Sequence, residues 1–437
     1  MQRVTVRGFG INVIGHVSGN LGLGVLARHV VGLLVSRGLP VRILDIDPKL
    51  GRGGHDRRFE ELTVASVDDL PYPVTLLIFP PNSTVDFLRD RRNRDLLFRP
   101  DGLNAVLINW EQRVVPPEWA SVLGGLDVIV APSGFTREVF QEAIPDVPVI
   151  STKVPLSLPE SVRHDRPSFG MHPDRVWFGS SFEPHSDPAR KNPLAVLEAF
   201  QRALPDRRDV GLMFKVNNAT VNGRTHPAVD ELRVRARKDG RIVLVEQALD
   251  YRAVLSLYAS LDVFVSLHRS EGIGLGLMEA MALGKPVVAT GWSGNMSFMD
   301  RSNACLVSYD LVPVRSNTDV YRQAVLGPHA VWADPGLTNA AEWIRTLVDR
   351  PDVLTSIGLK AQEAMERYQE DAQRGSFVDQ LRLIRESEVV WGIGLGRRRM
   401  RRARLEQAMT QRVVPAARPT SIWARGFRAL ARRVGLT

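Results

Sequence analysis

The chain has 437 residues, of which 44% are hydrophobic and 24% charged. This composition is that of a globular protein with room for two or three domains, and it excludes collagen-like, wholly disordered and coiled-coil chains. The single cysteine, Cys305, excludes a disulfide framework and a multi-cysteine metal site, and it fits a reducing compartment. The net charge of +9 is uneven, because residues 397–437 hold twelve arginines and one acidic residue. The slightly acidic remainder gives no indication of nucleic-acid binding by the folded body.

Hydrophobic runs are short throughout the chain. None approaches the ~20 apolar residues that span a bilayer, and the glycine-broken N-terminus is a poor signal peptide. We therefore expect a cytoplasmic protein, attached at most peripherally to the inner face of a membrane.

The first part of the chain has the pattern of a doubly wound domain. A short apolar strand at 10–15 precedes a glycine-rich turn, a helix at 25–37 with one apolar face, and a buried strand at 41–44. This order is a βαβ unit of a parallel sheet. Further strands are expected at 74–79, 105–109 and 127–131, so residues 1–165 are predicted to form one Rossmann-like α/β domain.

The same pattern restarts after a polar, proline-containing linker at 159–173. Strands are expected at 176–179, 210–215, 242–245, 263–267, 286–290 and 305–307, with helices between them. Residues 173–360 are therefore predicted to be a second doubly wound domain. Residues 361–388 are expected to form a long terminal helix, followed by an arginine-rich tail at 389–437. Two α/β domains commonly bind a ligand in the cleft between them.

The glycine-rich turn after the first strand contains Gly19, Gly22 and Gly24. Unpaired N–H groups at the start of the following helix could contact a phosphate. The alternative is a tight turn that requires glycine for its own geometry. Asp45 and Asp47 lie about 20 residues beyond, a spacing that leaves a dinucleotide-binding fold open.

A stronger pattern follows the strand at 263–267. Glu271 and Glu279 stand eight residues apart, with Gly272 and Gly274 between or beside them. The glycines allow close approach of a ligand to the backbone, and a helical carboxylate at Glu279 could accept hydrogen bonds from a ribose diol. The alternatives are acids on solvated faces, which the apolar neighbours of Glu279 disfavour, and a glycosidase-like carboxylate pair.

This segment resembles the E-x7-E signature of retaining GT-B glycosyltransferases of family 4, the bacterial glycosyl transferases group 1. The resemblance extends over residues 10–385 and includes residues 190–193, 285–290, 293–295, 12–28 and 110–111. It implies a GT-B fold, with two Rossmann-like domains facing across a cleft and a terminal helix that crosses back to the first domain.

The resemblance also implies roles for individual residues. Glu279 would hold the ribose, Glu271 the donor sugar, and Lys191 the diphosphate. The donor-binding set is then Gly22, Gly24, Lys191, Glu271, Gly272, Ile273, Gly274, Leu275 and Glu279. Many family members carry an arginine five residues before the lysine, where this chain has Ser186. The neighbouring Arg190 either supplies that charge or faces solvent, so the candidate catalytic residues are Glu271, Lys191 and Arg190.

Three further residues are candidates for the acceptor side: His16, Glu111 and Asn295. For His16 the alternative is a packed loop histidine, and His268 is expected to support the signature loop. Asp45 and Asp47 imitate a metal-binding DxD motif, but they end a strand of a Rossmann-like domain. We therefore expect no metal and no cofactor beyond the donor itself.

The function implied is transfer of a hexose from a nucleotide sugar to a glycan or lipid-linked acceptor. The resemblance favours GDP-mannose or a UDP-hexose as donor, with retention through front-face attack and no protein nucleophile. Two alternatives stay open: a nucleotide-sugar epimerase of GT-B fold and a non-catalytic nucleotide-sugar binding module. The E-x7-E segment argues against a nicotinamide oxidoreductase.

The tail has its own pattern. Trp423, Phe427, Leu430 and Val434 fall on one helical face, with arginines elsewhere. Such a basic amphipathic helix is typical of contact with an anionic membrane. The alternatives are a disordered, solubilising tail and, less favoured because no recognition fold accompanies the arginines, a nucleic-acid contact.

Overall fold

The computed structural model describes residues 9–47, 56–99, 102–221, 224–391, 400, 402–407 and 409. The chain divides into two compact units. Unit 1 comprises Met1–Ser157, Val325–Gly327 and Asp371–Thr437, and unit 2 comprises Leu158–Ala324 and Pro328–Glu370. The predicted linker thus belongs to unit 2. Arg166 explains this, because its guanidinium donates to the carbonyl of Ser260 at 3.0 Å and pairs with Asp262 at 2.6 Å.

Unit 1 contains a six-stranded parallel sheet of order β2-β1-β3-β4-β5-β6. Its strands are almost wholly apolar because helices cover both faces, as a parallel sheet requires. The strands are β1 (Ile11–Gly15), β2 (Val41–Asp45), β3 (Val74–Phe79), β4 (Leu103–Ile108), β5 (Val128–Ala131) and β6 (Val149–Ser151).

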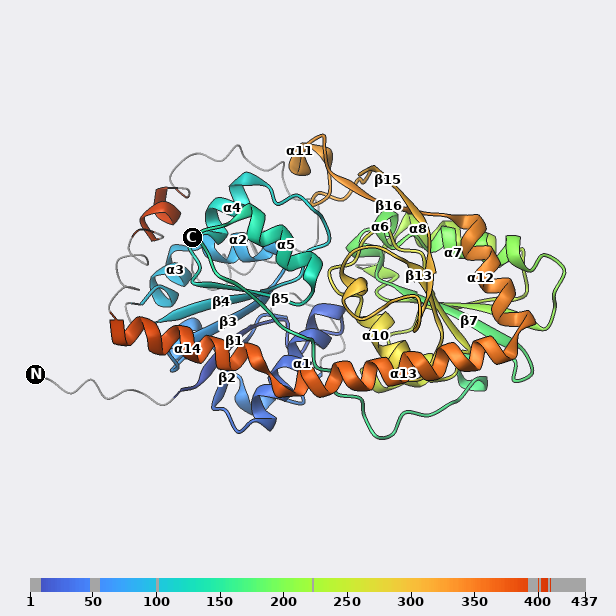
Figure 1. Cartoon of the computed structure of the whole chain (residues 1–437), viewed down its shortest axis with the longest axis horizontal. Helices are drawn as coiled ribbons and strands as arrows, with labels where there is room; N and C mark the ends of the chain where they lie inside the picture. The colour runs from blue at the N-terminus through green and yellow to red at the C-terminus, as the bar shows by residue number, and fades with distance from the viewer. Residues whose placement is uncertain are drawn as a thin grey trace, which may run out of the picture. The chain divides into compact units, whose positions relative to one another are not determined.

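The helices of unit 1 divide between the two faces of this sheet (Figure 1). Helix α1 covers one face, and the helices that follow β3, β4 and β5 cover the other. Right-handed crossovers produce this split, because the chain moves along the sheet in one direction after β1 and in the opposite direction after β3. These helices are α1 (Gly22–Ser36), α2 (Pro81–Arg89), α3 (Arg91–Leu97), α4 (Pro117–Leu123) and α5 (Gly134–Ala143).

Unit 2 repeats the architecture with a six-stranded parallel sheet of order β11-β8-β7-β12-β13-β14. The sequence-based prediction of two Rossmann-like α/β domains is confirmed. The strands are β7 (Val176–Phe182), β8 (Val210–Val216), β11 (Ile242–Val245), β12 (Val263–Ser266), β13 (Val287–Thr290) and β14 (Cys305–Val307). Two hairpins that were not predicted pair β9 (Thr220–Val221) with β10 (Arg224–Thr225), and β15 (Tyr309–Pro313) with β16 (Val331–Pro335).

The core of unit 2 lies between its sheet and the helices α7 and α12, where Phe178, Phe200 and Phe214 are fully buried. Cys305 is buried in the same core. The helices are α6 (Pro188–Lys191), α7 (Pro193–Ala203), α8 (Pro227–Ala236), α9 (Tyr251–Ala259), α10 (Leu275–Ala282) and α12 (Leu337–Asp349). Two helices include residues of both units, α11 (Gln323–Leu326) and α13 (Pro351–Arg374).

The predicted terminal helix at 361–388 is two helices, α13 and α14 (Ser376–Trp391). Gly375 separates them with a φ of +58°, a left-handed conformation that glycine adopts without strain. The Arg37 guanidinium donates to the carbonyl of Arg374 and pairs with Asp379 at 3.1 Å, which attaches this corner to α1. Among the described residues, no helix is long and apolar enough to cross a bilayer.

Candidate functional site

The candidate site lies where the strand order of the unit 2 sheet reverses. The chain leaves β7 towards β8 and leaves β12 towards β13, although β7 and β12 are neighbours in the sheet. The loops that follow two such strands diverge and leave a crevice at the carboxyl ends, which is where open α/β sheets bind ligands. The loop after β7 carries Arg190 and Lys191, and the loop after β12 carries Glu271.

These three predicted residues meet. The Lys191 ammonium donates to Oε1 of Glu271, and the Arg190 guanidinium lies 3.4 Å from Oε2 of the same carboxylate. Burial by itself would raise the pKa of Glu271, but Lys191 and then Arg190 outweigh it and lower the pKa to about 2. The carboxylate is therefore ionised at neutral pH and forms an ion triad with the two cations.

The two cations differ in what else they contact. Arg190 is buried and donates to the carbonyls of Ser270 at 2.9 Å and Ser186 at 3.0 Å, and its guanidinium lies over the Tyr321 ring. Lys191 keeps 22% of its side chain exposed. Arg190 thus joins the two loops, whereas the ammonium of Lys191 is the cation that a bound anion could reach.

Asp187, which the sequence analysis missed, organises the loop that carries both cations. Its carboxylate accepts from the N–H groups of Ala189 at 2.8 Å and Arg190 at 3.3 Å, and from the hydroxyl of Ser316. Its φ of +82° is unusual for a residue with a side chain. The dipeptide Asp187-Pro188 was the available signal, since aspartate at the N-cap and proline at the first helical position mark a helix start.

The glycines of the E-x7-E segment lead into α10. Gly274 is the N-cap of this helix and has a φ of +87°, which explains glycine there. The following N–H groups and the helix dipole favour an anion at this end. The remaining predicted donor contacts, Gly272, Ile273 and Leu275, belong to the same turn, and Ile273 is buried.

Glu279 is a buried acid on α10. It lies near Tyr258, whose pKa is raised first by burial and then by the negative charge of Glu279. Its neighbours Leu277 and Met278 are fully packed. A buried carboxylate at this position contradicts the alternative of a solvated helix face, and its ribose role stays a prediction.

A third loop, which follows β13, holds the Glu271 backbone. The Ser293 hydroxyl accepts from the N–H of Glu271 at 2.8 Å, and the N–H of Gly294 donates to the carbonyl of Glu271 at 2.9 Å. Asn295, predicted for the acceptor side, is fully buried in unit 2, where its amide donates to the carbonyl of Thr290 at 3.0 Å. This bond ties Asn295 to the end of β13, and its acceptor-side role stays a prediction.

His268 follows β12, three residues before Glu271 of the ion triad. It is fully buried, and neither ring nitrogen has a hydrogen-bond partner among the described residues. Burial, reinforced by Lys191 and Arg190, lowers its pKa to about 4 against the opposing effect of Glu271. The ring is consequently neutral at physiological pH, and its support of the signature loop stays a prediction.

In unit 1, the residues of the glycine-rich turn after β1 pack tightly against one another. A Cβ on Gly24 would overlap the carbonyl oxygen of Gly19 and approach that of His16 to 2.8 Å. Arg28 donates to the carbonyls of Val17 and Gly19 at 2.8 and 2.9 Å. Gly24 therefore fits the tight-turn interpretation. A Cβ on Gly22 would meet nothing within 4 Å, so packing does not require glycine there.

The two aspartates after β2 support the same turn. Nδ1 of His16 lies 3.0 Å from Oδ1 of Asp47, and both residues are buried. Asp45 accepts from the N–H groups of Ser18 at 3.1 Å and Asp47 at 3.2 Å. These contacts give both carboxylates a structural partner, and Asp47 holds the buried ring of His16, whose acceptor-side role stays a prediction.

Glu111 follows β4 and is buried. The neighbouring Asn109 amide lies 3.5 Å from its carboxylate. Gln112, which the sequence analysis did not single out, is buried with no hydrogen-bond partner for either amide atom among the described residues. The amide of Gln112 could thus bind a ligand beside Glu111, at the carboxyl edge of the unit 1 sheet.

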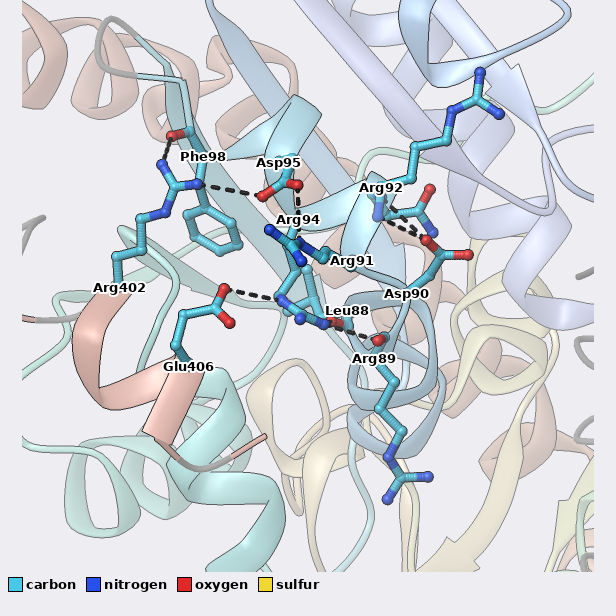
Figure 2. Close-up of polar contacts among 11 residues, drawn as sticks. Leu88, Arg89, Asp90, Arg91, Arg92, Arg94, Asp95, Phe98, Arg402 and Glu406 are labelled. Carbon is cyan, nitrogen blue, oxygen red and sulfur yellow. Dashed lines mark hydrogen bonds and ion pairs between the residues drawn. The ribbon is translucent and has the colours of Figure 1, made fainter. Parts of the chain in front are cut away.

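Part of the arginine-rich tail is docked on unit 1. Figure 2 shows Arg402 directed at the carbonyl of Phe98, at 2.8 Å, and Glu406 directed at Arg94, at 3.2 Å. Between them, Leu405 is fully buried. The predicted amphipathic stretch at 421–437 lies outside the described residues.

Sequence comparison matches one segment of the chain to a family model. Residues 185–315 match the model of the glycosyl transferases group 1. That segment contains the whole ion triad, Glu279 and the Ser293 loop. No curated protein matches the chain in sequence.

Solved structures share the fold of both units. Sucrose-phosphate synthase from Thermosynechococcus elongatus superposes with a TM-score of 0.60 at 15% identity, over 85% of this chain and 99% of that chain. The Anabaena protein HepE in complex with UDP and glucose gives 0.56 at 14%, over 85% and 99%. Pneumococcal O-GlcNAc transferase GtfA, in complex with UDP and GlcNAc, gives 0.48 at 13% over 70% of this chain, which spans only 56% of that structure. Together with the two Rossmann-like units, the similarities to sucrose-phosphate synthase and HepE show the GT-B fold.

Proposed function

We propose that the protein is a retaining family 4 glycosyltransferase that moves a hexose from a UDP-sugar to a glycan or lipid-linked acceptor. The observation that carries the proposal is the ion triad at the strand-order reversal of unit 2, inside the segment that matches the glycosyl transferases group 1. The UDP in the HepE structure favours a uridine nucleotide over the GDP-mannose alternative. No metal or further cofactor is proposed.

The groups of the site suit departure of a nucleoside diphosphate. The bond from the anomeric carbon to the β-phosphate oxygen breaks, and the leaving diphosphate gains negative charge. In this proposal the Lys191 ammonium and the N–H groups that open α10 stabilise that charge, commonly the largest contribution to catalysis. The acceptor oxygen bonds to the anomeric carbon on the same face, and its proton passes to a donor phosphate oxygen.

Each remaining group has an assigned part in this proposal. Glu279 holds the ribose and Glu271 holds the donor sugar. Arg190 fixes Glu271 and the segment after β7 that carries both cations. His16 and Glu111 of unit 1 belong to the acceptor side.

A binding panel tests the proposal. UDP, GDP, ADP and NAD are titrated by calorimetry into the wild type, Glu279→Ala and Lys191→Ala, with the exposed α7 variant Arg202→Ala as control. We expect UDP to bind, to raise the melting temperature of the wild type and the control, and to bind much more weakly to the two site variants. Binding of NAD alone, or UDP binding that neither site variant weakens, would contradict the proposal.

Turnover separates the two alternatives. A GT-B epimerase would convert a UDP-sugar to its epimer with no acceptor present, whereas a binding module would bind UDP and release no product with any acceptor. The proposed transferase should release UDP in proportion to acceptor glycosylated. Product analysis by NMR spectroscopy distinguishes the three outcomes.

We also propose that the tail, residues 397–437, contacts anionic lipid at the cytoplasmic face of a membrane. The arginine content and the apolar spacing from Trp423 to Val434 support this. Because Leu405 is buried in unit 1, a truncation must end at Met409 to leave the docked segment intact. We expect full-length protein to sediment with phosphatidylglycerol vesicles and the truncated chain to stay in solution. Equal sedimentation of the two proteins would refute the contact.

A further inference from the structure

The Ser293 backbone has a conformation that serine rarely adopts. Its φ is +75° and its ψ −143°, in a region that is essentially reserved for glycine. Ser293 is one of four described non-glycine residues with positive φ, and two of the others, Asp187 and Asn192, flank the Arg190–Lys191 pair. Among the described residues, positive-φ backbone therefore gathers around the ion triad.

The hydroxyl of Ser293 makes a contact that a glycine at this position could not make. It accepts from the N–H of Glu271 at 2.8 Å, while the next residue, Gly294, donates to the Glu271 carbonyl at 2.9 Å. Both peptide groups of Glu271 are thus held from one loop. Gly294 itself admits no side chain, because a Cβ there would overlap the carbonyl of Gly272. The two loops are packed backbone to backbone, and the hydroxyl is the only side-chain group of Ser293 that can reach the Glu271 amide.

We infer that Ser293 is a positioning residue, whose hydroxyl sets the Glu271 carboxylate for the donor sugar at the cost of backbone strain. This inference rests on the proposed function, in which Glu271 contacts the sugar. A residue kept only for packing would be glycine at this backbone conformation, because glycine adopts it without strain. Serine keeps the strained conformation and adds the hydrogen bond to the residue that defines the site.

Three substitutions separate the hydroxyl from the strain. Ser293→Gly removes both, Ser293→Ala removes only the hydroxyl, and Ser293→Thr keeps the hydroxyl with added β-branch crowding. The readout is the sugar increment, defined as the ratio of the UDP Kd to the Kd of the tightest-binding UDP-hexose. Calorimetry of UDP, UDP-glucose, UDP-galactose and UDP-N-acetylglucosamine gives it without an acceptor, and thermal unfolding gives the stability of each variant.

We expect the Gly and Ala variants to lose the sugar increment equally, by about tenfold, the usual effect of one polar contact. UDP itself should bind as in the wild type. The Gly variant should nevertheless unfold several degrees above the Ala variant, because only glycine relieves the strain. The Thr variant should keep the increment although it unfolds earlier.

Other results overturn the inference. If the increment follows stability, with Gly like the wild type and Thr impaired, Ser293 has a purely structural role. A wild type that binds UDP but gains nothing from any of the sugars also refutes it, while the nucleotide site stands. A wild type that binds no nucleoside diphosphate refutes the proposed function together with this inference. Should Thr fail to fold, the Gly and Ala pair still decides.

Discussion

The strand-order reversals of the two units are built in different ways. In unit 1, the turn after β1 packs Gly24 against its own carbonyls and holds His16 on Asp47. In unit 2, the loops after β7 and β12 bring Lys191 and Arg190 to Glu271, and the non-glycine residues with positive φ all belong to this unit among those described. Equivalent positions in two similar sheets thus carry a tight turn with a His16–Asp47 pair in one unit and an ion triad with positive-φ backbone in the other. Residues held in rarely populated backbone conformations cluster at functional sites.

The largest expected effect is a loss of stability in acid, when Glu271 of the ion triad is protonated. The pKa of Glu271 is about 2 in the folded protein, below its ordinary value of 4.5. The unfolded chain therefore binds the proton first, so this stabilisation is complete above pH 4.5 and is lost as the pH falls towards 2. The loss amounts to about 3 kcal/mol.

Urea unfolding of the wild type and Glu271→Gln between pH 7 and pH 2.5 measures this loss. The variant should be less stable at pH 7, because two cations lose their counter-charge, and the two free energies of unfolding should converge in acid. A constant difference across this range would show that Glu271 is not held by the triad in solution.

The next largest effect is on UDP affinity, which a substitution in unit 2 should weaken and a substitution in unit 1 should not. Lys191→Ala removes a charge-assisted contact of about 1.5–3 kcal/mol, so UDP should bind roughly 10- to 100-fold more weakly. His16→Ala, in the other unit, should leave the UDP Kd within about twofold. Calorimetry on both variants checks the contrast. Equal weakening by the two substitutions would erase the distinction between the units.

The smallest effect concerns the glycine turn of unit 1. Gly24→Ala should destabilise the protein by about 1–3 kcal/mol, because its Cβ would overlap the Gly19 carbonyl. Gly22→Ala is the matched control, since open space surrounds that position and alanine suits a helix. Differential scanning calorimetry should show a lower melting temperature for Gly24→Ala alone. If Gly22 contacts the donor, its variant keeps its stability and loses UDP affinity.

The sequence predicted most of the fold because parallel strands buried on both faces read as continuous apolar runs between helical periods. It located the β strands of both sheets except β6, a three-residue strand that is not fully buried. The hairpin of β15 and β16 escaped because exposed and buried residues follow no regular alternation along its strands. The hairpin of β9 and β10 escaped because strands of two residues are too short to show a period. The break in the terminal helix escaped too, although Gly375 was visible, since a single glycine inside a helical pattern is often tolerated.

Residue types and spacing by themselves singled out Glu271, Glu279 and the glycines around them as candidates for the site, and the resemblance to the E-x7-E signature added Lys191 and Arg190. Only the tertiary structure decided how they are used. It joined residues 80 positions apart into one triad, turned Arg190 inwards and left Lys191 accessible. It also showed that Asn295 is buried with its amide on the Thr290 carbonyl, and that Gly24 packs against the carbonyls of its own turn. The physical reason is that charge pairing, burial and backbone strain depend on contacts between distant segments, which local periodicity does not encode.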